Sequence, residues 1–132
     1  MRSASSVVNR RIRHGKILVV EHDHLTRETF AMMLKYFGYD VTVASDGREA
    51  TRLLNQVTPD LVVMDWRTPG LSGLSLCLAL RRRWPMIPIV VVTSSNEVLD
   101  DDQPANAWLQ KPIDPAILNR VIHSELAPVR SA

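Results

Sequence analysis

The chain has 132 residues, 45% of them hydrophobic and 23% charged, which is the composition of one globular domain large enough to bury a core. Its single cysteine, Cys77, excludes an internal disulfide, and the apolar stretch around it indicates a core residue and not a reactive thiol. No apolar run approaches the ~20 residues of a membrane span, and the first residues lack the apolar region of a signal peptide. We therefore expect a cytoplasmic protein.

The net charge of +2 is unevenly distributed along the chain. Residues 1–15 hold four arginines and no acidic residue, so the remainder is slightly acidic. We expect residues 1–15 to form a basic flexible arm, residues 16–127 the folded domain, and residues 128–132 a short tail. The arm is either a frayed terminus or a contact for nucleic acid or an acidic partner.

Short apolar runs alternate with segments whose apolar residues recur at helical spacing. In chain order, we predict strands at residues 16–20, 39–44, 61–64, 89–92 and 107–109. Between and after them we predict helices at residues 24–37, about 46–57, about 72–84 and about 115–126. Strand and helix alternate about five times, so the predicted fold is a doubly wound five-stranded parallel α/β sheet.

The segment between the fourth and fifth strands departs from this alternation. It contains three consecutive aspartates, Asp100 to Asp102, followed by Pro104, and these residues are unfavourable in a helix interior. We predict that the fourth helix of the alternation, the one between the fourth and fifth strands, is shortened or replaced by a loop, with at most a single turn at residues 97–99.

Polar side chains follow three of the predicted strands at the point where each strand ends. Asp65 follows residues 61–64, Thr93 follows residues 89–92, and Glu21, His22 and Asp23 follow the first strand. Parallel strands end at the same edge of a sheet, where ligands commonly bind. A carboxylate at a buried position is costly to desolvate without a partner or a function. The sequence therefore predicts one shared site at this edge.

Four motifs in this order and spacing carry a family resemblance: ILVVEHD, DLVVMDWRTPGLSG, PIVVVTS and the pair Lys111-Pro112. Together they resemble the signatures of response-regulator receiver domains of two-component signalling, which have a flavodoxin-like fold. The stretch DWRTPGLSGL is similar to the phosphoacceptor loop of the single-domain chemotaxis receivers. The resemblance covers residues 16 to about 126.

The resemblance implies a role for each matching position. Asp65 is the phosphoacceptor, a carboxylate that accepts a phosphoryl group from a partner histidine kinase or phosphotransfer protein. Thr93 donates its hydroxyl to a phosphoryl oxygen, and Lys111 supplies a positive charge to the same group. Trp108 occupies the position of an aromatic switch residue whose conformation follows the state of Thr93. Such a protein is not an enzyme, apart from self-catalysed phosphorylation and dephosphorylation.

The resemblance also implies an Mg²⁺ site, formed by Glu21, Asp65 and the backbone carbonyl of Arg67. The family usually has two adjacent acids after the first strand, whereas the second position here is His22. Imidazole is a poor ligand for Mg²⁺ and suits Mn²⁺ or other transition metals better, and Asp23 is one residue further along. Three interpretations remain open: weakened Mg²⁺ binding with phosphorylation retained, an altered metal preference, and inefficient phosphorylation.

Two further functions compete with the phosphorylation switch. His22 and the unusual fourth element favour a pseudo-receiver, a protein-interaction module that does not depend on phosphorylation. A small phosphohydrolase with Asp65 as nucleophile is disfavoured because Arg67 stands where a second carboxylate is needed. For any of these we expect an unknown downstream protein as partner, no DNA-binding domain in this chain, no membrane contact, and possible homodimerisation.

Overall fold

The computed structural model describes residues 15–67, 72–94 and 104–131. Residues 1–14 of the predicted arm, and residues 95–103, where a shortened helix or a loop was predicted, lie outside these ranges. Within them the chain forms five parallel strands and four helices. The strands are β1 (Lys16–Val20), β2 (Asp40–Ala44), β3 (Leu61–Asp65), β4 (Ile89–Thr93) and β5 (Ala107–Gln110). The helices are α2 (His24–Tyr36), α3 (Gly47–Leu53), α4 (Gly73–Arg83) and α5 (Pro115–Ser131).

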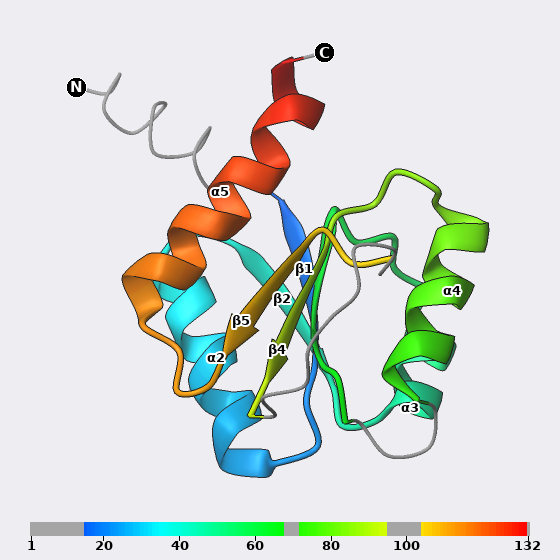
Figure 1. The fold of residues 1–132 in the computed structure, drawn as a ribbon, viewed down its shortest axis with the longest axis horizontal. Helices are drawn as coiled ribbons and strands as arrows, with labels where there is room; N and C mark the ends of the chain where they lie inside the picture. The colour runs from blue at the N-terminus through cyan, green and yellow to red at the C-terminus, as the bar shows by residue number, and fades with distance from the viewer. Residues whose placement is uncertain (1–14, 68–71, 95–103, 132) are drawn as a thin grey trace.

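The sheet has the strand order β2-β1-β3-β4-β5, so the chain winds outward from β1 in both directions. Helices α2 and α5 cover one face of the sheet, and helices α3 and α4 cover the other (Figure 1). This arrangement confirms the doubly wound parallel sheet that was predicted from the alternation of strands and helices. Helix α5 runs through residues 128–131, which had been expected to form a tail.

The three central strands are buried on both faces, which explains why their sequences are continuous apolar runs. Because side chains alternate along a strand, Ile17 and Val19 of β1 point into the core beneath α2 and α5. Leu18 and Val20 point into the opposite core beneath α3 and α4. Strands β3 and β4 divide their residues in the same way, so both cores depend on the same three strands.

Three of the helices begin at polar capping residues that the structure places at their N-termini. The side chains of Asp23, Asp46 and Ser72 accept hydrogen bonds from backbone N–H groups in the first turns of α2, α3 and α4. Helix α2 ends before Gly38, whose φ of 99° lies in the left-handed region that glycine adopts without strain. The helix predicted at residues 24–37 therefore ends within one residue of the observed C-terminus of α2.

Arg81 of α4 fixes the point at which the chain enters β5. Its guanidinium donates hydrogen bonds to the Pro104 carbonyl, at 2.8 and 3.1 Å, and to Asn106 Oδ1 at 2.6 Å. The same Asn106 oxygen accepts a hydrogen bond from the Ile89 N–H at the start of β4. These contacts tie β5 to both α4 and β4, and so they hold the strand that leads to Lys111.

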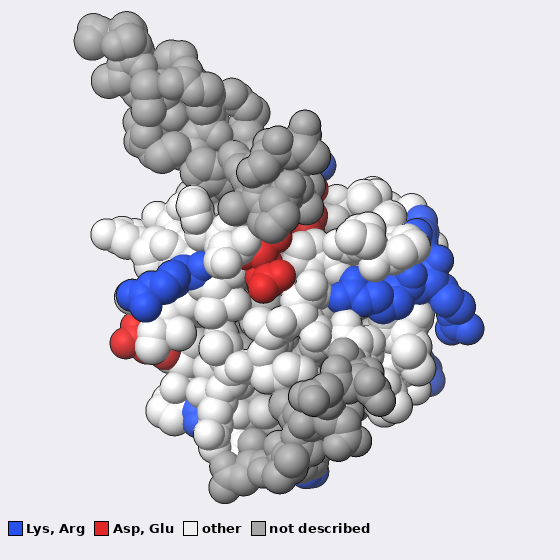
Figure 2. All heavy atoms as spheres, turned by 45° about the horizontal axis from the view of Figure 1, so that its top comes forward, with Lys and Arg blue, Asp and Glu red and all other residues white. Residues whose placement is uncertain are grey.

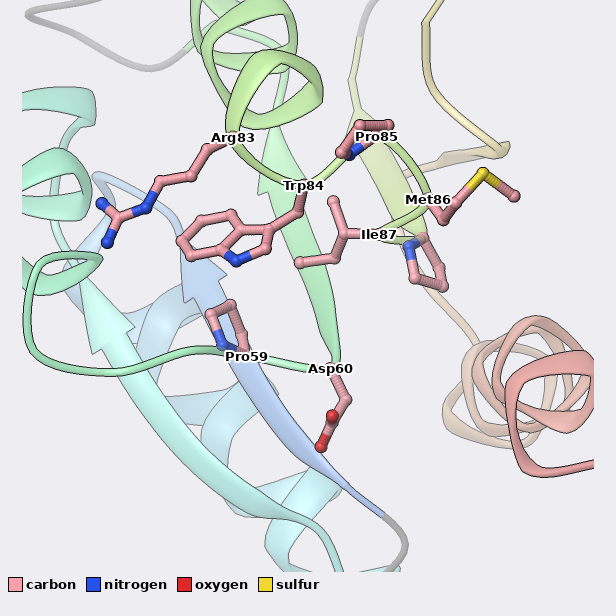
Figure 3. Close-up of a pocket in the computed structure, with 8 residues that line it drawn as sticks. Pro59, Asp60, Arg83, Trp84, Pro85, Met86 and Ile87 are labelled. Carbon is pink, nitrogen blue, oxygen red and sulfur yellow. The ribbon is translucent and has the colours of Figure 1, made fainter. Parts of the chain in front are cut away.

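Basic side chains and a groove lie at the edge of the sheet where the strands begin. Figure 2 looks onto this edge, and Lys and Arg side chains gather there on the side of α4. A groove of about 350 Å³ lies at the same edge, lined in part by Pro59, Trp84 and Met86 (Figure 3). The Arg83 guanidinium lies 4.6 Å from the centre of the Trp84 ring.

In the described part of the chain, no helix is both long enough and apolar enough to cross a membrane.

Cys77 lies on the buried face of α4, as expected for a core residue. Its Sγ is 3.6 Å from Met64 Sδ, and its side chain has no exposed surface. Burial raises the pKa of the Cys77 thiol to about 11, against a smaller opposing effect of the positive charge of Arg81. At pH 8 the thiol therefore carries very little of the reactive thiolate.

We expect native Cys77 to react with a thiol reagent such as dithionitrobenzoate at least roughly a hundredfold more slowly than in unfolded protein, because both the raised pKa and burial oppose the reaction. The measurement compares labelling rates at pH 8 with and without urea, the urea-unfolded chain being the control. Labelling of the native protein at the unfolded rate would contradict a core position.

Candidate functional site

The predicted site residues meet at the edge where the strands end. Glu21 follows β1, Asp65 and Thr93 are the last residues of β3 and β4, and Lys111 follows β5. Glu21 is fully buried, and Asp65 and Thr93 are 5% and 7% exposed. The sheet topology brings these residues together, because β1, β3, β4 and β5 are successive neighbours with parallel direction.

The centre of the site is an ion-pair network of one lysine and two carboxylates. Lys111 Nζ lies 2.7 Å from Glu21 Oε1 and 3.1 Å from Asp65 Oδ2. The backbone N–H of Arg67 donates a 3.0 Å hydrogen bond to Asp65 Oδ1, and the N–H of Asp23 donates one of 3.1 Å to Glu21 Oε2. Each carboxylate is therefore held in a defined orientation by one cationic and one backbone donor.

Two opposing effects act on the pKa of Lys111. Burial lowers it, but the hydrogen bonds and charges of Glu21 and Asp65 outweigh burial and raise it above its ordinary value. The extra stability that a raised pKa brings is fully present below the ordinary pKa of lysine, and it is lost as the pH rises through the raised value. At neutral pH the ammonium group of Lys111 is therefore charged.

The structure separates the roles of His22 and Asp23. The carboxylate of Asp23 caps α2, accepting hydrogen bonds from the Thr26 N–H at 2.9 Å and the Thr26 hydroxyl at 2.7 Å. Both hydrogen bonds lower the pKa of Asp23, and the bond from the Thr26 hydroxyl has the larger effect. His22 instead turns toward the site, with Nδ1 3.5 Å from Glu21 Oε2 and 3.9 Å from Asp65 Oδ2.

Thr93 and Arg67 lie beside the carboxylates. The backbone carbonyl of Thr93 accepts a 2.8 Å hydrogen bond from the Lys111 N–H, which links the ends of β4 and β5. Arg67 is exposed and is the second residue after the strand that ends at Asp65. The roles predicted for the Thr93 hydroxyl and for the Arg67 carbonyl stay predictions.

A second aromatic residue, Trp66, accompanies the predicted switch residue Trp108. The two rings lie 4.7 Å apart between centroids at an interplanar angle of 60°. Both are partly buried against the core that contains α4. Trp66 directly follows Asp65, so this pair joins the predicted phosphoacceptor position to β5. The sequence shows that Trp66 adjoins Asp65, but nothing in it indicates the contact with Trp108, which depends on the folded position of β5.

Gly73, the first residue of α4, allows Trp66 to take this position. A Cβ atom built on Gly73 would lie 2.5 Å from both the indole Cε3 and the backbone carbonyl oxygen of Trp66. A larger residue at 73 therefore requires the backbone after Asp65 to move.

The donor atoms at the site include three that lie close enough together for one metal ion. Among the described residues, Glu21, His22 and Asp65 each offer an atom within 4.8 Å of the other two. The two carboxylates provide the oxygen ligands that Mg²⁺ prefers, and His22 adds a nitrogen ligand that suits transition metals. The site thus fits a divalent cation, with one donor that is atypical for Mg²⁺.

Comparison with known proteins identifies the family. Residues 17–123 match the response regulator receiver domain, and this chain belongs to that family. It is 40% identical over 101 residues to the response regulator MprA of Mycolicibacterium vanbaalenii, covering 74% of this chain and 44% of MprA. It is 35% identical over 108 residues to the alkaline phosphatase synthesis transcriptional regulatory protein PhoP of Bacillus subtilis, covering 79% and 45%. The chain spans less than half the length of these curated relatives.

A solved structure agrees with this assignment. The receiver domain of a sensor histidine kinase from Pseudomonas aeruginosa is similar with a TM-score of 0.77 and 28% identity, covering 86% of this chain and 98% of that one. That structure contains a magnesium ion coordinated in its active site cleft. The family and the sheet topology together confirm the predicted flavodoxin-like receiver fold.

We expect Lys111→Met to lower the free energy of unfolding by about 1–3 kcal/mol at neutral pH, because the buried carboxylates of Glu21 and Asp65 lose their shared cation. Urea unfolding measures the change. The control is Lys35→Met, at an exposed position of α2, with an expected effect within about 0.5 kcal/mol. Equal effects of the two substitutions would show that the network contributes nothing to stability.

We expect Gly73→Ala to destabilise the protein by about 1–3 kcal/mol, because the added methyl group overlaps Trp66. The direction is informative, since alanine is ordinarily favoured over glycine in a helix by about 1 kcal/mol. Urea unfolding and tryptophan fluorescence of the native state measure the outcome. Leu78→Ala, at a half-exposed position of the same helix, is the control for helix propensity. A stabilised Gly73→Ala variant would mean that Trp66 does not occupy the described position.

Proposed function

We propose that this protein is a phosphorylation-dependent switch of a two-component system, which accepts a phosphoryl group on Asp65 from a partner histidine kinase or phosphotransfer protein. The observation that carries the proposal is the carboxylate of Asp65, buried yet held at the sheet edge between the Arg67 N–H and Lys111 Nζ. Family membership supports the general class, and the site geometry supports the particular residue.

The chemistry is a nucleophilic substitution at phosphorus. A carboxylate oxygen of Asp65 forms a bond to phosphorus, while the bond between phosphorus and the donor breaks. The electron pair of that bond leaves with the donor, which is an imidazole in a phosphohistidine or acetate in acetyl phosphate. Lys111 lies within hydrogen-bond distance of the Asp65 carboxylate, so its charge is available to the phosphoryl oxygens. The Thr93 hydroxyl is the proposed second donor.

A divalent cation, when bound, would supply further neutralisation of the negative charge on the transferred phosphoryl group. Glu21, Asp65, His22 and the backbone carbonyl of Arg67 are the proposed ligands. Asp23 is less suitable, because both of its hydrogen bonds to Thr26 are part of the α2 cap. We propose that His22 weakens the binding of Mg²⁺ relative to a site made only of oxygen ligands, and that Mn²⁺ can take its place.

A protein donor must approach the edge of the sheet where Asp65 lies. Beside this edge, α2 and the segment before α5 form a groove of about 660 Å³ whose lining includes Lys111. Leu25 in this lining is 74% exposed, and Pro112 and Ile113 adjoin it. An exposed apolar surface next to a polar reaction centre suits the docking of a partner protein.

Phosphorylation would shift an equilibrium between two conformations of the segment after Thr93 and of the region around Trp108. The contact between Trp66 and Trp108 supports this idea, because it joins the residue after Asp65 to β5. The protein would then be no enzyme toward a separate substrate, and its reactions would be the phosphorylation and dephosphorylation of Asp65. We place it in the cytoplasm, with a downstream protein partner and a possible homodimer as its output.

The second candidate function is a pseudo-receiver that binds a partner without phosphorylation. The presence of a histidine, His22, within 4 Å of both site carboxylates is the observation that favours it. The presence of Asp65, Thr93 and Lys111 together at one edge of the sheet favours the switch.

We expect the protein to gain the mass of one phosphoryl group when it is incubated with acetyl phosphate and either Mg²⁺ or Mn²⁺, because the small donor reaches Asp65 without a partner. Intact-mass spectrometry measures the adduct. Asp65→Asn should abolish it, whereas Asp46→Asn, which changes a capping carboxylate outside the site, should retain it. A protein that forms no adduct with either cation would favour the pseudo-receiver.

A further inference from the structure

The cluster of potential cation ligands, Glu21, His22 and Asp65, includes one nitrogen donor. Glu21 and Asp65 are buried and provide oxygen atoms, and His22 Nδ1 lies 3.5 and 3.9 Å from one oxygen of each. Ligand atoms that lie about 2.0–2.2 Å from one metal ion are roughly 3–3.5 Å apart from each other. The three donors are therefore close to the separation that a single ion requires, and small side-chain adjustments are sufficient.

No nearby carboxylate among the described residues is available to replace this nitrogen. Asp23 is the nearest acidic residue in sequence, but its side chain accepts two hydrogen bonds from Thr26 at 2.7 and 2.9 Å. Its backbone N–H also donates to Glu21 Oε2, which further fixes its position. Turning this carboxylate into the site would remove the N-terminal cap of α2.

His22 is free to act as a ligand in a way that the other nearby histidine is not. The His22 side chain is 52% exposed, so its second ring nitrogen can stay hydrated while Nδ1 faces the carboxylates. His24 Nδ1 instead lies 3.1 Å from the Arg27 guanidinium, and His24 is absent from the cluster of potential ligands.

We propose that His22 Nδ1 ligates a first-row transition-metal dication together with the carboxylates of Glu21 and Asp65, and that this nitrogen raises the preference of the site for such an ion over Mg²⁺ above that of a site with only oxygen ligands. Imidazole nitrogen binds Zn²⁺, Co²⁺ and Mn²⁺ more favourably than it binds Mg²⁺, which demands oxygen ligands and gives up its water reluctantly. The inference rests on the proposed function only in that both use the same site.

The test measures the ratio of Zn²⁺ to Mg²⁺ affinity, by calorimetry, for the native sequence, His22→Asp, His22→Asn and the control His24→Asp. A ratio is needed because almost any mixed site binds Zn²⁺ more tightly than Mg²⁺. We expect His22→Asp to lower the ratio by on the order of tenfold or more, and His24→Asp to leave it unchanged. His22→Asn, which adds no charge, should weaken Zn²⁺ binding without the gain in Mg²⁺ affinity.

A second readout detects the nitrogen directly. Pulsed electron paramagnetic resonance of the Mn²⁺-loaded protein should show coupling to a histidine ¹⁴N nucleus that disappears in both His22 variants and persists in His24→Asp. Circular dichroism checks that each variant is folded. An unchanged affinity ratio in His22→Asp, or no ¹⁴N coupling in the native sequence, would overturn the proposal.

The result is separable from that of the proposed function. A protein that forms the acyl phosphate on Asp65 but has the same metal ratio with and without His22 retains the switch and loses the metal preference. A protein that shows the His22-dependent ratio but never forms the adduct retains the metal site and loses the switch.

Discussion

The ammonium group of Lys111 between the carboxylates of Glu21 and Asp65 is the interaction on which the site depends. Two buried carboxylates this close together repel each other when both are charged, and one lysine that contacts both offsets part of this repulsion. The lysine can reach them only because β5 lies next to β4 and ends at the same edge as β1 and β3. The reactivity proposed for Asp65 therefore depends on the order of the strands as much as on the residue itself.

The same dependence explains why β5 is anchored at its beginning. Arg81 and Asn106 connect the start of this short strand to α4 and β4 by side-chain hydrogen bonds. At its other end the Lys111 N–H is held by the Thr93 carbonyl. Between these two points Trp108 contacts Trp66, the neighbour of Asp65. A strand held at both ends, with an aromatic contact to the residue after Asp65 between them, is a suitable element for transmitting a change at the site.

Most of the fold could be predicted from sequence because its signals are local. The apolar runs that became β1, β3 and β4 are buried on both faces, and a strand with this environment needs no polar alternation. The helices predicted at residues 24–37 and about 72–84 agree with α2 and α4, because the end of α2 at Gly38 and the cap of α4 at Ser72 depend only on neighbouring backbone groups. Helix α5 is longer than its apolar spacing indicated, since that spacing ends at Leu126 while the helix continues to Ser131.

Some features of the candidate site could be predicted from the sequence, and others are seen only in the folded structure. The strand ends at which Glu21, Asp65, Thr93 and Lys111 stand could be predicted from sequence, because the hydrophobic runs and turn signals that mark them are local. The sequence left His22 and Asp23 as alternatives. In the folded chain the two side chains take different positions, since the α2 cap engages Asp23 while His22 turns toward the carboxylates. The contact of Trp66 with Trp108 was decided only by the tertiary structure, because it joins residues far apart in the chain.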